Sequence, residues 1–289
     1  MTDRVTRRSF VKTSGMIGGA AAIFGFDDFD FLVQDGGYPA TDDDTMVVPP
    51  EFPGQDSGSV MAIVTAAHAQ LDKITEMVSA RPALAKASWD WGFGDWESAL
   101  GAASHMGRHD IAEVLMAHGA RPDIFTFAML GRLEVVRSMV EASPGIQRTP
   151  GPHGIILMQH ARMRLNRKGL TEPDYALARG MIQYLEGIGE ADIAAESQEM
   201  QDGAAEAFLG VYRFGDGNKD VLTVYQHRRG WLMLKRGAQG GRRLHYVASE
   251  TFAPAGAPAV RIRFEVANGS ARTVTVHDPI PLVKAVREA

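Results

Sequence analysis

The chain has 289 residues, 45% of them hydrophobic and 22% charged, and its formal net charge is −5. This length and apolar content are sufficient for two modest domains. The absence of cysteine excludes disulfides, thiol catalysis, iron–sulfur clusters and cysteine-ligated zinc sites.

The first dozen residues place two adjacent arginines ahead of an uncharged run. Arg7 and Arg8 are followed by Phe10 and Lys12, and the uncharged run covers 13–26. This order resembles the twin-arginine export signal of bacteria, which a receptor reads and which moves folded proteins. The alternative is a buried N-terminal helix that happens to begin with two arginines. The run is shorter than the roughly 20 apolar residues of a membrane-spanning helix.

The resemblance implies a signal over residues 1–26 and a protein of the periplasm or cell envelope. Any contact with the membrane would then be made through an uncleaved signal. Residues 27–58 are rich in aspartate, glycine and proline, which predicts a disordered acidic linker. The run Asp42-Asp43-Asp44 lacks the ligand spacing and closing glutamate of a calcium loop, so we interpret it as solvated.

Residues 59–205 show helical periodicity that recurs, most clearly between 98 and 120. Small side chains in the first half of this unit allow a short helix to pack closely, and Gly107 ends that helix with a residue that accepts positive φ. Ile111, Val114 and Leu115 then share one face of a second helix. The unit therefore predicts two short helices joined at a glycine.

This unit resembles the ankyrin repeat. Ser98-Ala99-Leu100-Gly101-Ala102-Ala103 stands where the family has Thr-Pro-Leu-His-x-Ala, and His118-Gly119-Ala120 covers the usual Gly-Ala ending. Weaker copies precede and follow it. Gly107 and Gly131 are 24 positions apart, short of the usual period of about 33. The resemblance implies stacked helix pairs that bind another protein without catalysis.

From residue 206 to residue 289 the hydrophobic period changes to two. Six strand-like segments separated by tight turns predict an antiparallel meander, either a curved sheet or a half-open barrel. Phe208–Tyr212, Gly230-Trp231-Leu232 and Phe264–Gly269 resemble the small β domain attached to penicillin-recognising serine hydrolases. We therefore predict an α+β protein, a short ankyrin-like α-solenoid followed by a small antiparallel β-sheet domain.

The two predicted domains differ in charge. Residues 27–205 carry 13 basic and 27 acidic side chains, a balance of −14, and residues 206–289 carry 13 and 7, a balance of +6. The basic side chains of the β domain cluster at its turns, and Arg242 is one of them. Docking onto the acidic repeats, or simple solvation, is favoured over an anionic ligand. The charge distribution does not indicate nucleic acid.

Histidines provide the first candidate chemistry. His105 and His109 are four residues apart and His118 follows, but Gly107 lies at the predicted turn between the first two. Two imidazoles at this spacing share a metal only when they share a helix. We therefore predict no metal site and no cofactor.

A second candidate involves His153 and His160, which flank an apolar segment. No serine lies in a Gly-x-Ser-x-Gly elbow, so acyl transfer has no nucleophile. Asp95 and Glu97 form a possible pair of acid–base carboxylates, but a cap ahead of the helix at Ser98 is the simpler interpretation. We predict no catalytic residue.

The aromatic side chains Trp89, Trp91, Phe93 and Trp96 lie within eight residues, and tryptophan is enriched in interface hot spots. They form either a partner-binding surface or a cover for the first repeat, and both interpretations remain open. The sequence favours an exported, non-catalytic protein–protein interaction scaffold with a protein partner. The alternatives are a cofactor- or ligand-binding periplasmic protein and an accessory protein of an envelope hydrolase.

Overall fold

The computed structural model describes residues 50–166, 169–194 and 197–288. The predicted export signal, with Arg7, Arg8, Phe10 and Lys12, lies outside the described residues, and so does most of the predicted linker. Within the described part of the chain, the helices are all too short or too polar to cross a membrane.

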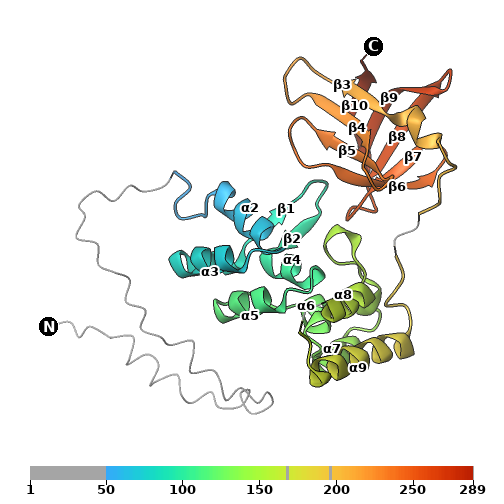
Figure 1. Ribbon diagram of the computed structural model, residues 1–289. Coiled ribbons are helices and arrows are strands. Elements are labelled where there is room, and N and C mark those ends of the chain that lie inside the picture. Colours follow the sequence, from blue (N-terminus) through green and yellow to red (C-terminus); the bar gives the residue numbers. More distant parts are fainter. Residues whose placement is uncertain (1–49, 167–168, 195–196, 289) are drawn as a thin grey trace, which may run out of the picture. The chain divides into compact units, whose positions relative to one another are not determined.

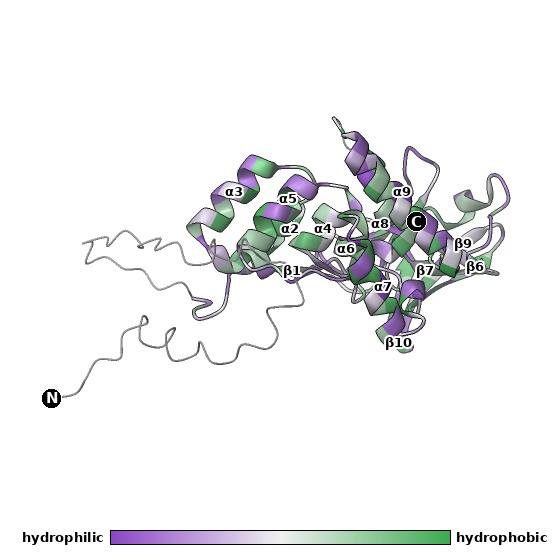
Figure 2. Cartoon of the chain, turned by 90° about the horizontal axis from the view of Figure 1, so that it is seen from below, coloured by the Kyte–Doolittle hydropathy of each residue, from purple (hydrophilic) through white to green (hydrophobic). Residues whose placement is uncertain are grey.

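Eight α-helices make up the first part of the described chain (Figure 1). They are α2 (Ser57–Ala66), α3 (Leu71–Ala80), α4 (Ala99–His105), α5 (His109–Ala117), α6 (Ile124–Met129), α7 (Leu133–Ala142), α8 (Leu157–Met163) and α9 (Glu172–Ile188). Helices α3, α5 and α9 each carry hydrophobic and hydrophilic residues, as Figure 2 shows, which is typical of helices with one buried side.

Short polar side chains determine where several of these helices begin. The side chain of Ser98 accepts a hydrogen bond from the backbone N–H of Gly101 at the start of α4, and Asp123 caps α6 in the same way. Asp56 caps α2, so this helix begins inside the segment 27–58 that we predicted to be a linker. Thr171 and Asp174 form a reciprocal capping box at α9.

Gly107 ends α4 as the sequence predicts, with φ of 66°. A Cβ atom at this position would lie 2.4 Å from the carbonyl oxygen of Met163, at the end of α8. Only glycine satisfies both the left-handed backbone and this close approach. His105 and His109 consequently lie on different helices, also as predicted.

The helices bury two separate apolar clusters. Ile63, Leu100 and Leu115 belong to the first cluster, which lies mainly among helices α2, α3, α4 and α5. Met158 and Leu185 belong to the second cluster, which lies among helices α6, α7, α8 and α9. A two-stranded hairpin, β1 (Ser88–Asp90) and β2 (Trp96–Ser98), precedes α4. It pairs Trp89 with Glu97 and lies beside α2 and α4, which positions the residues of its tip and second strand next to the helices.

The last part of the chain is a closed eight-stranded antiparallel barrel. Its strands are β3 (Gly210–Arg213), β4 (Val221–Gln226), β5 (Leu232–Arg236), β6 (Arg242–Ala248), β7 (Thr251–Pro254), β8 (Arg261–Ala267), β9 (Ser270–Asp278) and β10 (Ile280–Arg287). Each strand pairs with its sequence neighbour, and β10 returns to pair with β3. Tyr212, Phe252 and Phe264 fill the interior.

The predicted fold class is therefore wrong. The chain is not a short solenoid with a small antiparallel sheet, because eight helices with two cores precede a closed barrel. Two of these strands were not predicted from the sequence. β7 has only four residues and ends in proline, and β10 exposes its apolar side chains instead of alternating clearly. Since β10 is the strand that pairs with both β9 and β3, missing it left the predicted sheet open.

The predicted boundary between residues 205 and 206 falls inside the 3-10 helix η6 (Ala204–Phe208). Phe208 at its end already packs in the barrel interior against Phe252 and Phe264, with ring centroids 5.0 and 4.9 Å apart. η6 therefore leads directly into the barrel, and the last helix before it, α9, ends at Ile188.

Candidate metal centre

Four metal-ligating side chains converge between the hairpin and the helices. They are His68 from the α2–α3 connection, Glu97 from β2, His105 from the end of α4 and His153 from the 3-10 helix η4 (Pro152–Gly154). One ligand atom from each residue lies within 4.8 Å of those of the other three. Four segments that are far apart in sequence therefore share one small volume.

The carboxylate of Glu97 is the centre of this group, which we call the histidine cluster (His68, Glu97, His105, His153). Its Oε1 lies 2.8 Å from Nε2 of His105 and 3.3 Å from Nε2 of His153. Its Oε2 lies 3.6 Å from Nε2 of His68 and accepts a hydrogen bond of 2.7 Å from Nε1 of Trp91. The Glu97 side chain is fully buried, so these groups replace water around its charge.

The neighbouring charges change the ionisation of the cluster. Burial raises the pKa of Glu97, but hydrogen bonds and charge from His105 and His153 outweigh it and hold that pKa far below its ordinary value. Burial lowers the pKa of His153, but Asp95 and Glu97 outweigh it and raise that pKa to about 9. At neutral pH, without a metal, an ionised carboxylate thus faces a protonated imidazole.

Asp95 holds His153 in place with both carboxylate oxygens. Oδ1 accepts a hydrogen bond of 2.8 Å from the backbone N–H of His153, and Oδ2 lies 2.7 Å from its Nδ1. His153 has φ of 59°, a left-handed conformation that is rare outside glycine. A buried carboxylate that binds both the backbone and the ring offsets this strain and points Nε2 at Glu97.

The barrel also contacts the carboxylate of Asp95. Nη2 of Arg242, on β6, lies 2.9 Å from Oδ2 of Asp95, and its Nε donates a hydrogen bond of 3.0 Å to the carbonyl oxygen of Trp91. A Cβ atom at Gly256 would lie 2.4 Å from the Asp95 carboxyl carbon. The barrel therefore meets the hairpin at Asp95. The charge distribution favoured docking of the basic side chains onto the acidic region, or their solvation, and the pair between Arg242 and Asp95 is a contact of the first kind.

His68 is oriented through its other ring nitrogen. Nδ1 lies 3.1 Å from the carbonyl oxygen of Val64 and 3.2 Å from that of Thr65, so Nδ1 carries the proton in the neutral ring. Nε2 is then a lone-pair donor directed at the cluster. His68 and His153 thus both engage a second-sphere acceptor through Nδ1, as histidine ligands of metals do.

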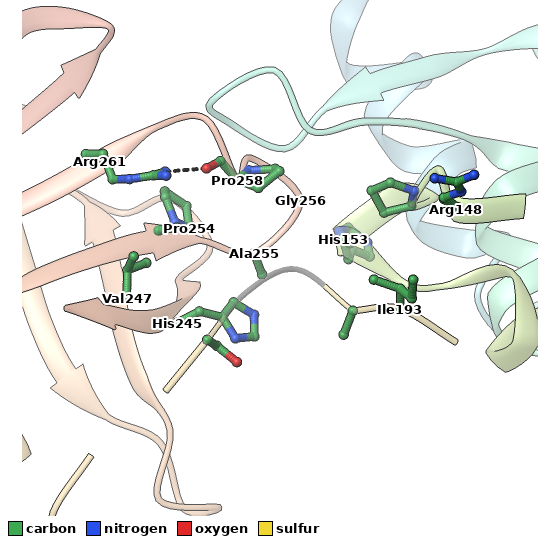
Figure 3. Close-up of a pocket in the computed structure, with 15 residues that line it drawn as sticks. Arg148, His153, Ile193, His245, Val247, Pro254, Ala255, Gly256, Pro258 and Arg261 are labelled. Carbon is green, nitrogen blue, oxygen red and sulfur yellow. Dashed lines mark hydrogen bonds between the residues drawn. The ribbon is translucent and has the colours of Figure 1, made fainter. Parts of the chain in front are cut away.

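A cavity of about 400 Å³ opens on the His153 side of the cluster. Figure 3 shows His153 and Arg148 on one side of it and His245, Pro254 and Arg261 on the other. Among its described lining residues, the titratable side chains are all basic: Arg148, His153, His245 and Arg261. Arg148 pairs with Glu190 outside the lining, at 3.0 Å. Of the four cluster residues, His153 is the one that lines this cavity.

The structure separates the four aromatic residues that the sequence analysis grouped as a partner-binding surface. Trp89 and Trp91 pack against the helical core, whereas Phe93 packs against the barrel core. Trp96 is 63% exposed. Trp89 and Trp91 therefore cover the helical core beside them, Phe93 covers the barrel and not the first helices, and Trp96 is the exposed one of the four.

The histidines that form the cluster are not the ones that lie close together in the sequence. His105 joins His68 and His153, whereas His118 binds its own helix, with Nδ1 2.8 Å from the carbonyl oxygen of Val114. His160 is separate from the cluster as well. Its Nδ1 lies 2.8 Å from Oγ of Ser104, and burial lowers its pKa to about 3.

The cap interpretation of Asp95 and Glu97 is wrong, because Ser98 itself caps α4 and both carboxylates serve the cluster. His68 was missed altogether. The available signals were the carboxylates Asp95 and Glu97, the first immediately before a short strand and the second within it, and a histidine between Pro152 and Gly154. No pattern of fixed spacing links them to His68.

Comparison with known proteins does not assign this chain to a family: no family model, no curated protein and no solved structure matches it.

Proposed function

We propose that this protein binds a divalent transition metal of the zinc class at the histidine cluster. The observation that carries the proposal is the convergence of three imidazole Nε2 atoms on one buried carboxylate, with Nδ1 of His68 and His153 held by second-sphere acceptors. Three nitrogens and one oxygen form a donor set that zinc commonly uses in proteins.

The dimensions of the cluster suit such an ion. A tetrahedral zinc site with bonds of about 2.0–2.1 Å has ligand atoms about 3.4 Å apart. Oε1 of Glu97 lies 2.8 and 3.3 Å from Nε2 of His105 and His153, Oε2 lies 3.6 Å from Nε2 of His68, and one ligand atom from each of the four residues lies within 4.8 Å of the others, so binding an ion requires only small side-chain shifts. A cation at the centre would replace the protons that the carboxylate and imidazoles now share, and would neutralise the buried charge of Glu97.

Loss of the metal on mutation tests the proposal. Protein stripped with a chelator and reloaded with zinc should hold one ion per chain by elemental analysis, and cobalt should give the visible absorption of a four-coordinate site. Glu97→Gln and His105→Asn should reduce the bound metal at least tenfold. His118→Asn is the matched control, because this histidine lies outside the cluster and should keep full loading. Reloaded wild-type protein with less than a tenth of an ion per chain would refute the proposal.

The exported interaction scaffold is a second candidate function. Trp96 supports it, because this side chain is 63% exposed on a hairpin whose other strand is half-buried. Immobilised protein should retain a specific periplasmic partner, and Trp96→Ala should release it. Phe52→Ala is the control, since Phe52 is 70% exposed elsewhere. Equal retention by all three proteins would mean that Trp96 is not the contact.

A further inference from the structure

The barrel is incompletely paired at one end. β10 pairs with β9 from Ile280 to Val286, but it pairs with β3 only at Val286 and Arg287. β3 ends at Arg213, so the first half of β10 extends past it. At this end, which we call the barrel mouth, the wall between β10 and β3 therefore has no ladder of hydrogen bonds.

A cavity of about 470 Å³ occupies the barrel mouth. It reaches the barrel interior, because Leu222, Leu234 and Val276 belong both to its lining and to the buried core. Further apolar side chains complete the lining: Trp91, Phe93, Phe214, Leu282 and Val283. The volume lies within the range of about 300–1,000 Å³ that is typical of small-molecule sites, and barrel mouths are one of their usual locations.

The charged part of the lining is entirely basic. Lys235, Arg236 and Arg242 line the cavity, and no aspartate or glutamate is among its described lining residues. Arg242 is already paired with Asp95, and Arg236 lies 3.5 Å from Asp220. The guanidinium of Arg236 lies 5.3 Å from the ring of Phe214, which also lines the cavity, whereas Lys235 lies on the outward face of β5, with its Nζ 5.8 Å from the ring of Tyr225.

We propose that the barrel mouth binds a single-chain amphiphile, with its apolar chain among the apolar lining side chains and its anionic head group at Arg236. Side chains fill the centre of this eight-stranded barrel, and the cavity at its mouth leaves room for one small ligand. The apolar lining supplies the affinity for the chain, and the absence of acidic side chains selects the sign of the head group. This site adjoins the histidine cluster, because Trp91 and Arg242 line it and also contact Glu97 and Asp95, but none of the four cluster residues lines it and binding there needs no metal.

Titration with decanoate, below its micelle concentration, tests the site on the full chain, both zinc-loaded and metal-stripped. Calorimetry should show one decanoate per chain in both forms, and decanol should bind at least fivefold more weakly. Arg236→Gln should weaken decanoate about fivefold and leave decanol unchanged, whereas Lys235→Gln, on the outward face of the same strand, should change neither. Equal affinity for decanoate and decanol, or no decanoate binding at 1 mM, would overturn the proposal.

A charge reversal at the mouth locates the ligand. Leu282→Glu should weaken decanoate at least tenfold, because Leu282 lines the cavity and is 59% exposed, so the fold tolerates the change. Val286→Glu is the matched control, on the same strand, 60% exposed and outside the lining. Equal weakening by both variants, with thermal melting unchanged, would place the ligand elsewhere and overturn the assignment.

Discussion

Asp95 connects three parts of the molecule through one carboxylate. It holds the backbone and ring of His153, it pairs with Arg242 of the barrel, and it lies against Gly256. Burial raises the pKa of Asp95, but hydrogen bonds and charge from His153 and then Arg242 outweigh it, so the group stays ionised at neutral pH. His153 and Arg242 require the negative charge of this carboxylate and not only its shape.

Replacing this carboxylate should loosen the proposed metal site without removing a ligand. Asp95→Asn should lower zinc affinity about 10- to 100-fold, because second-sphere partners of histidine ligands contribute on that scale. It should also destabilise the fold by about 3–5 kcal/mol, since Arg242 is left buried without its counter-charge. Chelator competition and urea unfolding measure the two effects. Asp110→Asn, in a surface pair with Arg108, should change neither; an unchanged zinc affinity in Asp95→Asn would contradict the second-sphere role.

Alanine substitutions at Gly107 and Gly180 compare two glycines with different surroundings. Gly107→Ala should destabilise the protein by at least about 2 kcal/mol, because a left-handed backbone and the carbonyl of Met163 both oppose a Cβ atom. Gly180→Ala, inside α9 with open space around it, should stabilise by about 0.5–1 kcal/mol through helix propensity. Denaturant midpoints measure both. Equal effects would mean that helix propensity, not close packing, governs the first site.

At the scale of elements, the capping box of α9 makes stability depend on pH. Hydrogen bonds from Thr171, and then the charge of Arg164, lower the pKa of Asp174 from 3.8 to about 2. A carboxyl with a lowered pKa contributes stability that is present above its ordinary pKa and is lost as the pH falls through the lowered one.

Asp174→Asn should therefore destabilise the protein at pH 5, and the difference from wild type should shrink between pH 4 and pH 2. Urea midpoints measured across this range follow the change. Glu186→Gln is the control, because Glu186 makes only a long surface pair of 3.9 Å with Arg162. A wild-type advantage that persists undiminished at pH 2 would contradict the role of the ionised Asp174.

Individual elements differed in how well their residues predicted them. β4 and β5 alternate buried and half-buried residues and were both predicted, as was the turn at Gly107. β7 and β10 were missed because their burial comes from the neighbouring strands and not from a period-two pattern of their own. The residues of one strand do not reveal which other strands will pack beside it.

At the scale of the whole molecule, the destination of the protein remains a prediction from the first dozen residues. Replacing both Arg7 and Arg8 with lysine should retain the full-length chain in the cytoplasmic fraction of a bacterial host, whereas wild type should reach the periplasm. The receptor reads the arginine pair itself and not the positive charge. Arg4→Lys, outside the pair, should be exported normally. Identical fractionation of all three chains would contradict a twin-arginine signal.

The sequence by itself determined the local features: the absence of thiol chemistry, the helix pair around Gly107, most strands and the opposite charges of the two halves. These follow from short-range backbone preferences and composition. Only the tertiary structure decided the closure of the barrel and the convergence of His68, Glu97, His105 and His153. Both depend on which distant segments pack together, and burial of Glu97 and Asp95 is tolerated only because those segments bring the compensating imidazoles and Arg242.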